Sequence, residues 1–127
     1  AKLSFNLRFS PATSTEKIKG IIEKILLNHG VKYQLNWKVN GQPFLTKPGN
    51  FVGIVKQSIA EVTGVQAELS TTGGTSDARF ISKICDQVIE LGPINKTIHQ
   101  VNEKININDL ERLVKIYKGV LSGLLDG

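Results

Sequence analysis

A short polar loop, Thr72-Gly73-Gly74-Thr75-Ser76-Asp77, holds the first residues that could do chemistry. The two glycines permit main-chain conformations and close approaches that a side chain would prevent. We expect a helix to begin beside them, and its free N–H groups and positive dipole end would suit a carboxylate or a phosphate. The spacing is not that of the phosphate-binding loop of nucleotide hydrolases, because no Lys follows the glycines. A plain helix start, capped by Ser76 or Asp77, explains the same residues.

His99 is the second candidate, since it lies in a loop that follows a predicted strand over 87–91. The loops at strand ends are where α/β folds gather their site residues. A metal site normally takes three or four protein ligands, and the sequence has neither a His-x-x-x-His nor a Cys-x-x-Cys pair. A metal ligand and a structural imidazole therefore both stay open. We interpret His29, at a predicted helix end, as structural.

Arg8 is the third candidate. It lies on the polar face of a predicted strand in a stretch without other charges. Its planar guanidinium is well suited to binding a carboxylate, although a solvated Arg on a strand is an equally good interpretation.

The first forty residues are expected to position Arg8. Residues 3–9 and 31–39 alternate apolar and polar side chains, which predicts two half-buried strands. Between them, Thr13 and Glu16 form a capping box and begin a helix that Gly30 ends. Two strands and one helix are marginal as an isolated unit, so we expect further strands from elsewhere or from a partner chain.

A turn-rich break near residue 40 is our predicted domain boundary, since Gly, Pro and Asn are frequent there. The rest of the chain alternates helices and strands, which predicts an α/β fold. In order, we predict a helix over 51–63 capped by Asn50 and closed by Gly64, a strand over 65–70, a helix over 76–85, a strand over 87–91, and a helix that begins at an Asn108–Glu111 capping pair.

Composition limits the class of protein. The 127 residues, 40% hydrophobic and 21% charged, allow one domain of ordinary size and exclude a disordered or collagenous chain. No apolar run is long enough to span a bilayer, so we expect no membrane partner. The chain contains no Met and begins at Ala1, so we expect a processed product, an excised domain or a fragment. The single Cys85 precludes an internal disulfide, is expected to be buried, and favours the cytoplasm.

Positive charge is concentrated in the first half of the chain. Residues 1–50 have a net charge of +6, whereas residues 51–127 have a net charge of −1. A basic half can indicate an anionic partner, which would fit a small binding or oligomerisation module. The alternative is that Lys17, Lys19 and Lys24 solvate the outer face of a helix. The aromatic residues do not interleave with the lysines, so we expect no nucleic-acid partner.

Four motifs in a fixed order carry a resemblance to a known family. They are Phe5–Phe9, Gly41–Thr46, Gly73–Phe80 and Glu90–His99. Together they resemble the C-terminal third of the succinyl-diaminopimelate desuccinylase family, bacterial dinuclear zinc amidohydrolases of the aminoacylase and carboxypeptidase superfamily. The resemblance covers essentially the whole chain.

The resemblance implies a hydrolase that cleaves N-succinyl-diaminopimelate into succinate and diaminopimelate, in lysine and cell-wall precursor biosynthesis. It implies two zinc ions, with cobalt as a possible replacement, that activate a bridging water and polarise the amide carbonyl. By similarity His99 is a ligand of one zinc ion. The positions expected to bind substrate carboxylate or amide groups are Arg8, Gly73, Gly74, Thr75 and Asn95.

The resemblance also implies a division of the chain. Residues 1–40 resemble the second, β-α-β half of an α+β dimerisation domain, and residues 41–127 resemble the C-terminal part of a mixed-sheet, zinc-peptidase-like catalytic domain. A homodimer is therefore expected. The family's other zinc ligands and its general base belong to sequence that this chain does not contain, so we predict that the chain alone is inactive. A related enzyme for another N-acyl amino acid, or a non-catalytic binding module, is the alternative.

Overall fold

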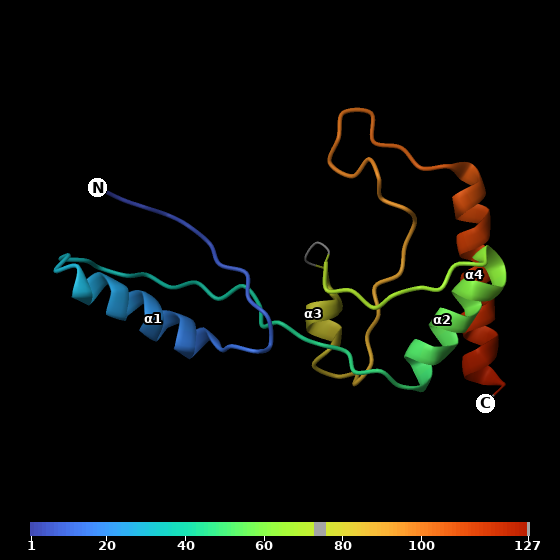
Figure 1. The fold of residues 1–127 in the computed structure, drawn as a ribbon, viewed down its shortest axis with the longest axis horizontal. Helices are drawn as coiled ribbons and strands as arrows, with labels where there is room; N and C mark the ends of the chain where they lie inside the picture. The colour runs from blue at the N-terminus through green and yellow to red at the C-terminus, as the bar shows by residue number, and fades with distance from the viewer. Residues whose placement is uncertain (73–75, 127) are drawn as a thin grey trace. The chain divides into compact units, whose positions relative to one another are not determined.

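The computed structural model describes residues 1–72 and 76–126, and these residues contain four helices (Figure 1). The helices are α1 (Thr15–Asn28), α2 (Asn50–Thr63), α3 (Ala78–Ile81) and α4 (Ile107–Leu125). The chain divides into two compact units, Ala1–Leu45 and Thr46–Gly127. None of the described helices combines the length and the apolar character that crossing a membrane requires.

The first unit is built on α1, whose two ends are closed by local signals. Ser14, not the predicted Thr13, is the N-cap, and its hydroxyl accepts a hydrogen bond from the Lys17 N–H at 3.1 Å. The C-terminal end confirms the prediction for Gly30, which has a left-handed φ of 63°. The Gly30 N–H donates to the Leu27 carbonyl and the Val31 N–H to the Leu26 carbonyl, which is a Schellman motif.

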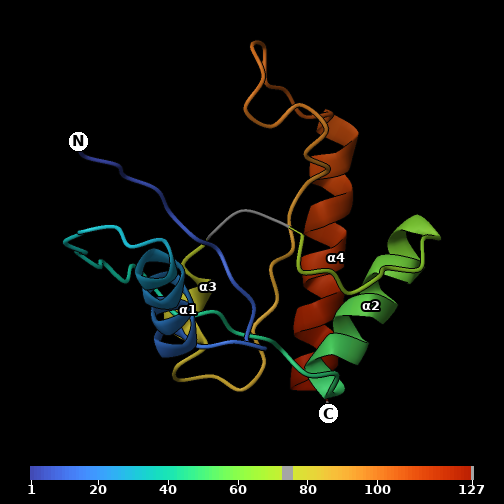
Figure 2. The same cartoon turned by 60° about the vertical axis from the view of Figure 1, so that its left-hand side comes forward.

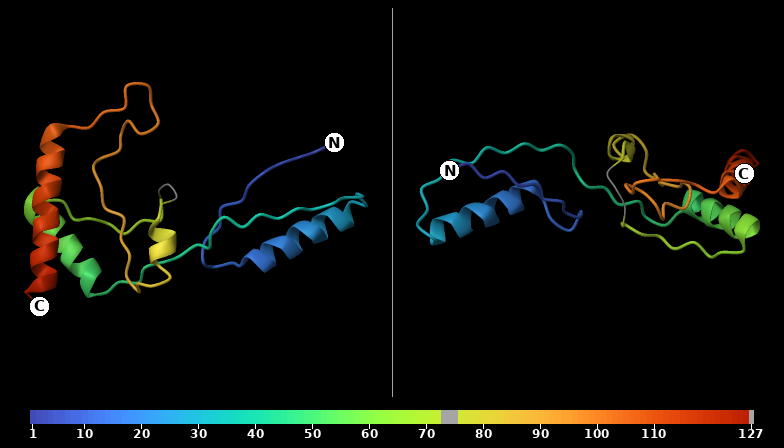
Figure 3. Two further views of the ribbon diagram at one scale, coloured as in Figure 1. Left: turned by 180° about the vertical axis from the view of Figure 1, so that it is seen from behind. Right: turned by 90° about the horizontal axis from the view of Figure 1, so that it is seen from above.

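The strands predicted over 3–9 and 31–39 are not formed, and the segments before and after α1 run as coil (Figure 3). A strand exists only when its N–H and C=O groups pair with a neighbouring strand. No described residue is in a strand, so the mixed sheet is likewise not formed within this chain. Most of the apolar side chains that the alternation predicts to be half-buried are exposed here, with Leu3 at 84% and Phe5 at 56%.

One contact ties the end of the first unit to its helix. The buried Thr15 hydroxyl accepts a hydrogen bond from the Gln42 side-chain amide at 3.1 Å. The predicted boundary at residue 40 would separate these two residues. The two compact units meet at Leu45/Thr46, so the segment following residue 40 stays with α1, and the division into domains at residues 40 and 41 stays a prediction.

The core of the second unit lies between α2 and α4, which are the pair of helices in contact within the described part of the chain (Figure 2). Val55, Ile116 and Val120 are its buried centre. Partly buried side chains surround them: Phe51, Ile54, Ile59, Val62, Ile89 and Leu91. The apolar side chains of α2 therefore face the core, as in an amphipathic helix.

Glycines on α4 let the two helices approach closely. A Cβ at Gly123 would lie 2.8 Å from the Ile54 Cγ2, and one at Gly119 would lie 3.1 Å from the Ser58 Oγ. Ser58 is only 4% exposed, so a small polar side chain fills the space opposite Gly119. The two glycines are one helical turn apart on the same face of α4.

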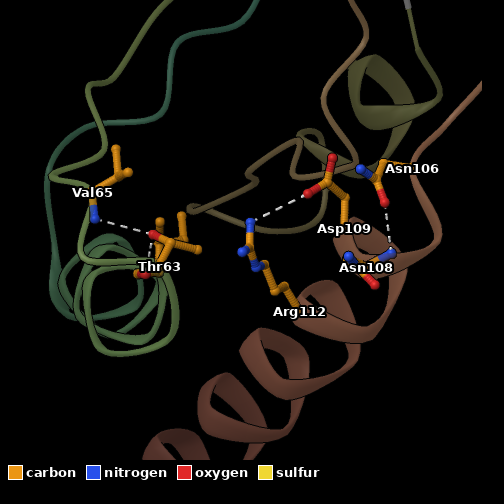
Figure 4. Close-up of polar contacts among 7 residues, drawn as sticks. Thr63, Val65, Asn106, Asn108, Asp109 and Arg112 are labelled. Carbon is orange, nitrogen blue, oxygen red and sulfur yellow. Dashed lines mark hydrogen bonds and ion pairs between the residues drawn. The ribbon is translucent and has the colours of Figure 1, made fainter.

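The predicted caps of α2 and α4 are wrong by one or two residues. The N-cap of α2 is Gly49, beside which the Gln87 side chain packs, and not Asn50. Asn106 caps α4, accepting from the Asn108 N–H at 2.9 Å (Figure 4). Asn108 was predicted as the cap, but it lies inside the first turn. The end of α2 is as predicted, because Gly64 has a φ of 71°.

The helix predicted over 76–85 is much shorter in the structure. α3 is a four-residue turn, and the residues that follow it form turns up to Ile84. Cys85 consequently lies beyond the helix and is exposed, so the prediction of a buried thiol is wrong. The strands predicted over 65–70 and 87–91 are also not formed.

Candidate functional site

Residues 88–91 form the base of the candidate site, because three parts of the second unit hold this segment. The side chains of Ile89 and Leu91 pack against the core of α2 and α4. Polar groups of the same segment bond to side chains from three other places in the sequence, Thr46, Ser76 and Tyr117. The loop with Asn95 and His99 leaves directly from this anchored segment.

Thr46 anchors the beginning of the segment. Its Oγ1 donates to the Val88 carbonyl at 2.5 Å and accepts from the Val88 N–H at 3.1 Å. The hydroxyl thus satisfies both main-chain groups of Val88, as a neighbouring strand would.

Ser76 connects the segment to the start of α3. Its hydroxyl donates to a Glu90 carboxylate oxygen and accepts from the Ala78 N–H at 3.0 Å. Asp77 occupies the N-cap position without a side-chain capping hydrogen bond, and the Ser76 hydroxyl satisfies the free Ala78 N–H.

Tyr117 anchors the end of the segment to α4. Its hydroxyl donates to the Leu91 carbonyl at 2.7 Å. The aromatic ring is 45% exposed, so Tyr117 reaches the segment from the rim of the helix pair and not from its core.

A depression of about 530 Å³ lies against this segment. Asn95 lines it together with Ser76, Glu90 and Tyr117, and the remaining lining residues are Thr72, Ile89, Leu91, Gly92 and Pro93. The polar side chains of this lining are a carboxylate, three hydroxyls and an amide, so together they offer both donors and acceptors of hydrogen bonds. The structure therefore brings Asn95 together with the residues that flank the glycine-rich loop.

His99 lies in a separate, tightly turned part of the same loop. The Thr97 Oγ1 donates to the Lys104 carbonyl at 2.9 Å and accepts from the Lys104 N–H at 3.0 Å, which closes the loop at its base. Within it, His99 has a φ of 62°, an uncommon conformation for a residue with a side chain. The imidazole is exposed and does not line the depression that holds Asn95.

The described residues do not complete a metal site. Among residues 1–72 and 76–126, no three His, Cys, Asp or Glu side chains gather closely enough to hold a metal ion. His99 has the correct chemistry for a single zinc ligand, since an exposed imidazole nitrogen is free to coordinate. A single imidazole does not complete a metal site, which normally takes three or four protein ligands.

Comparison with known proteins decides the family. A family model described as "Peptidase family M20/M25/M40" matches residues 6–123. This chain belongs to peptidase family M20/M25/M40. Three similar proteins, each named succinyl-diaminopimelate desuccinylase, come from Nitrosomonas europaea, Bordetella parapertussis and Polaromonas naphthalenivorans. The identities are 50% over 123 residues, 50% over 121 residues and 52% over 122 residues, respectively.

The M20/M25/M40 chain is much shorter than these relatives. The alignments cover 97%, 95% and 96% of this chain but only 33%, 32% and 30% of the respective relatives. The chain thus spans about a third of the length of the curated relatives it matches.

Two further groups of predicted site residues remain in the M20/M25/M40 chain, Arg8 and the glycine-rich loop. Arg8 belongs to the first unit, where its side chain is exposed. Gly73, Gly74 and Thr75 lie outside the described residues, although Thr72 and Ser76 on either side of them line the depression.

Sequence reasoning missed Thr46, Glu90 and Tyr117. None of the three is among the candidate residues that the sequence indicates. Thr46 and Glu90 do lie at the edges of the motifs that resemble the family, which was the one available signal. Tyr117 had none, since its apolar ring fits the helical stripe equally well.

Proposed function

We propose that the full-length protein carrying this chain hydrolyses N-succinyl-diaminopimelate to succinate and diaminopimelate. The observation that carries the proposal is about 50% identity to three desuccinylases over almost the whole chain. The depression around Asn95 supports it, because its amide, hydroxyl and carboxylate groups suit a polar substrate with an amide and several charged groups.

Each predicted site residue has a role in this proposal. The Asn95 amide, the Thr75 hydroxyl and the Gly73-Gly74 main chain would bind the substrate's carboxylate or amide oxygens. Arg8 would bind a substrate carboxylate through its guanidinium. His99 would be a ligand of one of two zinc ions, and the other ligands and the general base would lie outside this chain.

The two units have proposed roles as well. The unit Ala1–Leu45 would belong to the second half of a dimerisation domain, and the unit Thr46–Gly127 to the catalytic domain. The segments over 3–9 and 31–39 would become strands once neighbours from the remaining sequence or a second subunit pair with them, which would also bury Leu3 and Phe5. We place the enzyme in the cytoplasm, since the one Cys of this chain cannot form an internal disulfide.

A hydrolysis assay with three arms tests the proposal. The zinc-loaded full-length protein should release succinate from N-succinyl-diaminopimelate. The N-acetyl analogue of the same amine should react much more slowly, because it lacks the succinyl carboxylate. The 127-residue chain alone should release nothing, since it supplies one ligand to a two-metal site. A full-length protein that prefers the acetyl compound, or that hydrolyses neither, would contradict the proposal.

A further inference from the structure

We infer that Thr97 is a positioning residue for His99, because its hydroxyl closes the loop that carries the imidazole. The inference rests on the proposed function, in which His99 is a ligand of one zinc ion. It goes beyond that function, since it names the contact that fixes where the ligand lies. The residues that carry the inference lie within 91–106, a segment that the structure describes throughout.

One hydroxyl group closes the loop between Thr97 and Lys104. The Thr97 Oγ1 donates to the Lys104 carbonyl at 2.9 Å and accepts from the Lys104 N–H at 3.0 Å. A single side chain therefore satisfies both main-chain groups of Lys104, as a neighbouring strand would. His99 lies between the two residues that these hydrogen bonds join.

Main-chain hydrogen bonds alone do not close this loop. The Gln100 N–H donates to the Thr97 carbonyl at 3.1 Å, and the Glu103 N–H donates to the Gln100 carbonyl at 3.2 Å. Each of these bonds connects residues three positions apart, so each forms a single turn. The Thr97 hydroxyl joins the beginning of the first turn to the residue after the second. We expect its loss to leave each turn in place but to free their orientation relative to one another.

The main chain of the loop is held in an uncommon conformation at two residues. His99 has a φ of 62° and Asn102 has a φ of 67°, in the left-handed region that glycine adopts most readily. Asn and His enter this region more often than other residues with a side chain, but it remains uncommon for both. Such a conformation persists where the surrounding contacts fix the main chain. The hydrogen bonds between Thr97 and Lys104 lie on both sides of the two left-handed residues and provide such contacts.

The chain on both sides of the loop is connected to α4. Before the loop, the Leu91 carbonyl accepts a hydrogen bond from the Tyr117 hydroxyl on α4 at 2.7 Å. After the loop, Asn106 is the N-cap of α4 and lies two residues beyond Lys104. Since α4 forms the core of the second unit with α2, the closed loop places His99 relative to this pair of packed helices.

The Thr97 hydroxyl acts through His99 and not as a metal ligand itself. It already donates one hydrogen bond and accepts another, both within the loop. A zinc–imidazole bond is about 2.0–2.1 Å long, so a displacement of the His99 main chain by a fraction of this length weakens it. Removal of groups that orient a ligand typically lowers metal affinity by about 10–100-fold.

The zinc affinity of the full-length protein tests the inference with a pair of substitutions. Thr97→Val keeps the shape of the side chain but removes both hydrogen bonds, so the dissociation constant of one zinc ion should rise about tenfold. Thr97→Ser keeps the hydroxyl and should stay within about threefold of the wild type. Competition with a chelating dye measures both values without substrate turnover. An unchanged zinc affinity in Thr97→Val overturns the inference.

Thr63→Val is the matched control for Thr97→Val. The Thr63 hydroxyl makes the same pair of contacts, since it donates to the Ile59 carbonyl at 2.7 Å and accepts from the Val65 N–H at 3.1 Å. These contacts close the end of α2, so their loss should leave the zinc affinity unchanged. An equal loss of zinc affinity in Thr63→Val would show a general effect of destabilisation and would overturn the inference.

Asn102 tests the conformation of the loop without any change to the hydroxyl. Asn102→Gly is compatible with a φ of 67° and should bind zinc as tightly as the wild type. Asn102→Val places a β-branched side chain in the left-handed region and should weaken zinc binding about tenfold, as Thr97→Val does. Equal zinc affinities in the glycine and valine variants would mean that the loop conformation does not position His99, which is contrary to the inference.

Hydrogen–deuterium exchange of the zinc-free full-length protein gives a result that depends on neither metal nor turnover. Amides of residues 98–104 should exchange faster in Thr97→Val than in the wild type, and in Thr97→Ser they should not. Unchanged exchange in Thr97→Val overturns the inference.

His99→Ala distinguishes failure of the inference from failure of the proposed function. If His99→Ala loses zinc while Thr97→Val does not, the inference is wrong and the ligand role of His99 stands. If both variants lose zinc but the wild type does not hydrolyse N-succinyl-diaminopimelate, the proposed function is wrong and the inference stands.

Discussion

Thr46 and Val88 are joined by two hydrogen bonds through a single hydroxyl group. The Thr46 Oγ1 donates to the Val88 carbonyl at 2.5 Å and accepts from the Val88 N–H at 3.1 Å. The contact links the first residue of the second unit to the segment from which the Asn95 and His99 loop departs. A side chain here performs the pairing that the predicted strand over 87–91 would need from a neighbouring strand.

Replacing this hydroxyl should destabilise the second unit. Thr46→Val keeps the shape of the side chain but leaves the partly buried N–H and C=O of Val88 unpaired, so we expect a loss of about 1–2 kcal/mol in the free energy of unfolding. Thr46→Ser keeps the hydroxyl and should lose less. Urea unfolding of the protein gives the values.

Thr63→Val is the control for Thr46→Val. The Thr63 Oγ1 also donates to a carbonyl, that of Ile59, and accepts from an N–H, that of Val65 (Figure 4). These contacts are exposed and local to the end of α2, where water can replace them. The expected loss is about 0.5 kcal/mol or less. An equal decrease in the free energy of unfolding for the two valine variants would show that the Thr46 hydrogen bonds stabilise the protein no more than the exposed ones of Thr63.

Glycine-to-alanine substitutions on α2 and α4 should have opposite effects on the stability of the protein. A Cβ at Gly53 meets nothing within 4 Å, so Gly53→Ala should stabilise the protein by about 0.5–1 kcal/mol through helix propensity alone. At Gly123 the same Cβ would lie 2.8 Å from the Ile54 Cγ2, an atom near the α2 main chain that cannot easily move aside. Gly123→Ala should therefore lower the melting temperature. If the melting temperature rises for both variants, the close contact between residue 123 and Ile54 does not oppose a side chain, and the prediction is wrong.

Removing the Tyr117 hydroxyl should loosen the Leu91 anchor. Tyr117→Phe deletes the donor to the Leu91 carbonyl at 2.7 Å and should cost about 0.5–1.5 kcal/mol of stability, toward the lower value because the residue is partly exposed. Chemical unfolding followed by circular dichroism measures it. Tyr33→Phe, at a hydroxyl without a hydrogen-bond partner among the described residues, should change nothing, and an equal loss there would contradict the prediction.

His99→Ala should reduce both metal content and activity in the zinc-loaded full-length protein. Loss of a direct ligand should cost more than loss of a supporting group, which typically costs about 10–100-fold, so we expect kcat to fall by more than about a hundredfold. His29→Ala removes the other histidine, which follows α1, and should change neither quantity. Zinc analysis by mass spectrometry with parallel assays gives both values, and full zinc content in His99→Ala would exclude a ligand role.

The helices were predictable because their signals are local. The apolar spacing of α1, α2 and α4, and the glycines that follow α1 and α2, lie within a few residues of what they specify. The caps of α1 and α4 differ from the prediction by one or two residues because neighbouring Ser, Thr and Asn side chains compete for the same free N–H groups, whereas α2 begins at Gly49 without a side-chain capping hydrogen bond. The predicted strands are not formed for a different reason. An alternation of apolar and polar side chains predicts a half-buried strand, but it does not provide the neighbouring strand with which the main chain must form hydrogen bonds.

In α4 it is clearest which features the local sequence specifies and which depend on tertiary contacts. Its sequence alone determines that an amphipathic helix forms. The apolar stripe is broader than one contact, however, and Leu110, Val114, Leu121 and Leu124 remain exposed while Ile116 packs in the core. Which side packs depends on α2, because Gly119 and Gly123 offer the flat surface that Ser58 and Ile54 approach. The motifs around Gly73 and His99 were likewise enough to indicate the family. The hydrogen bonds of Thr46, Glu90 and Tyr117, in contrast, join residues that are distant in sequence. Only the folded structure brings such groups together.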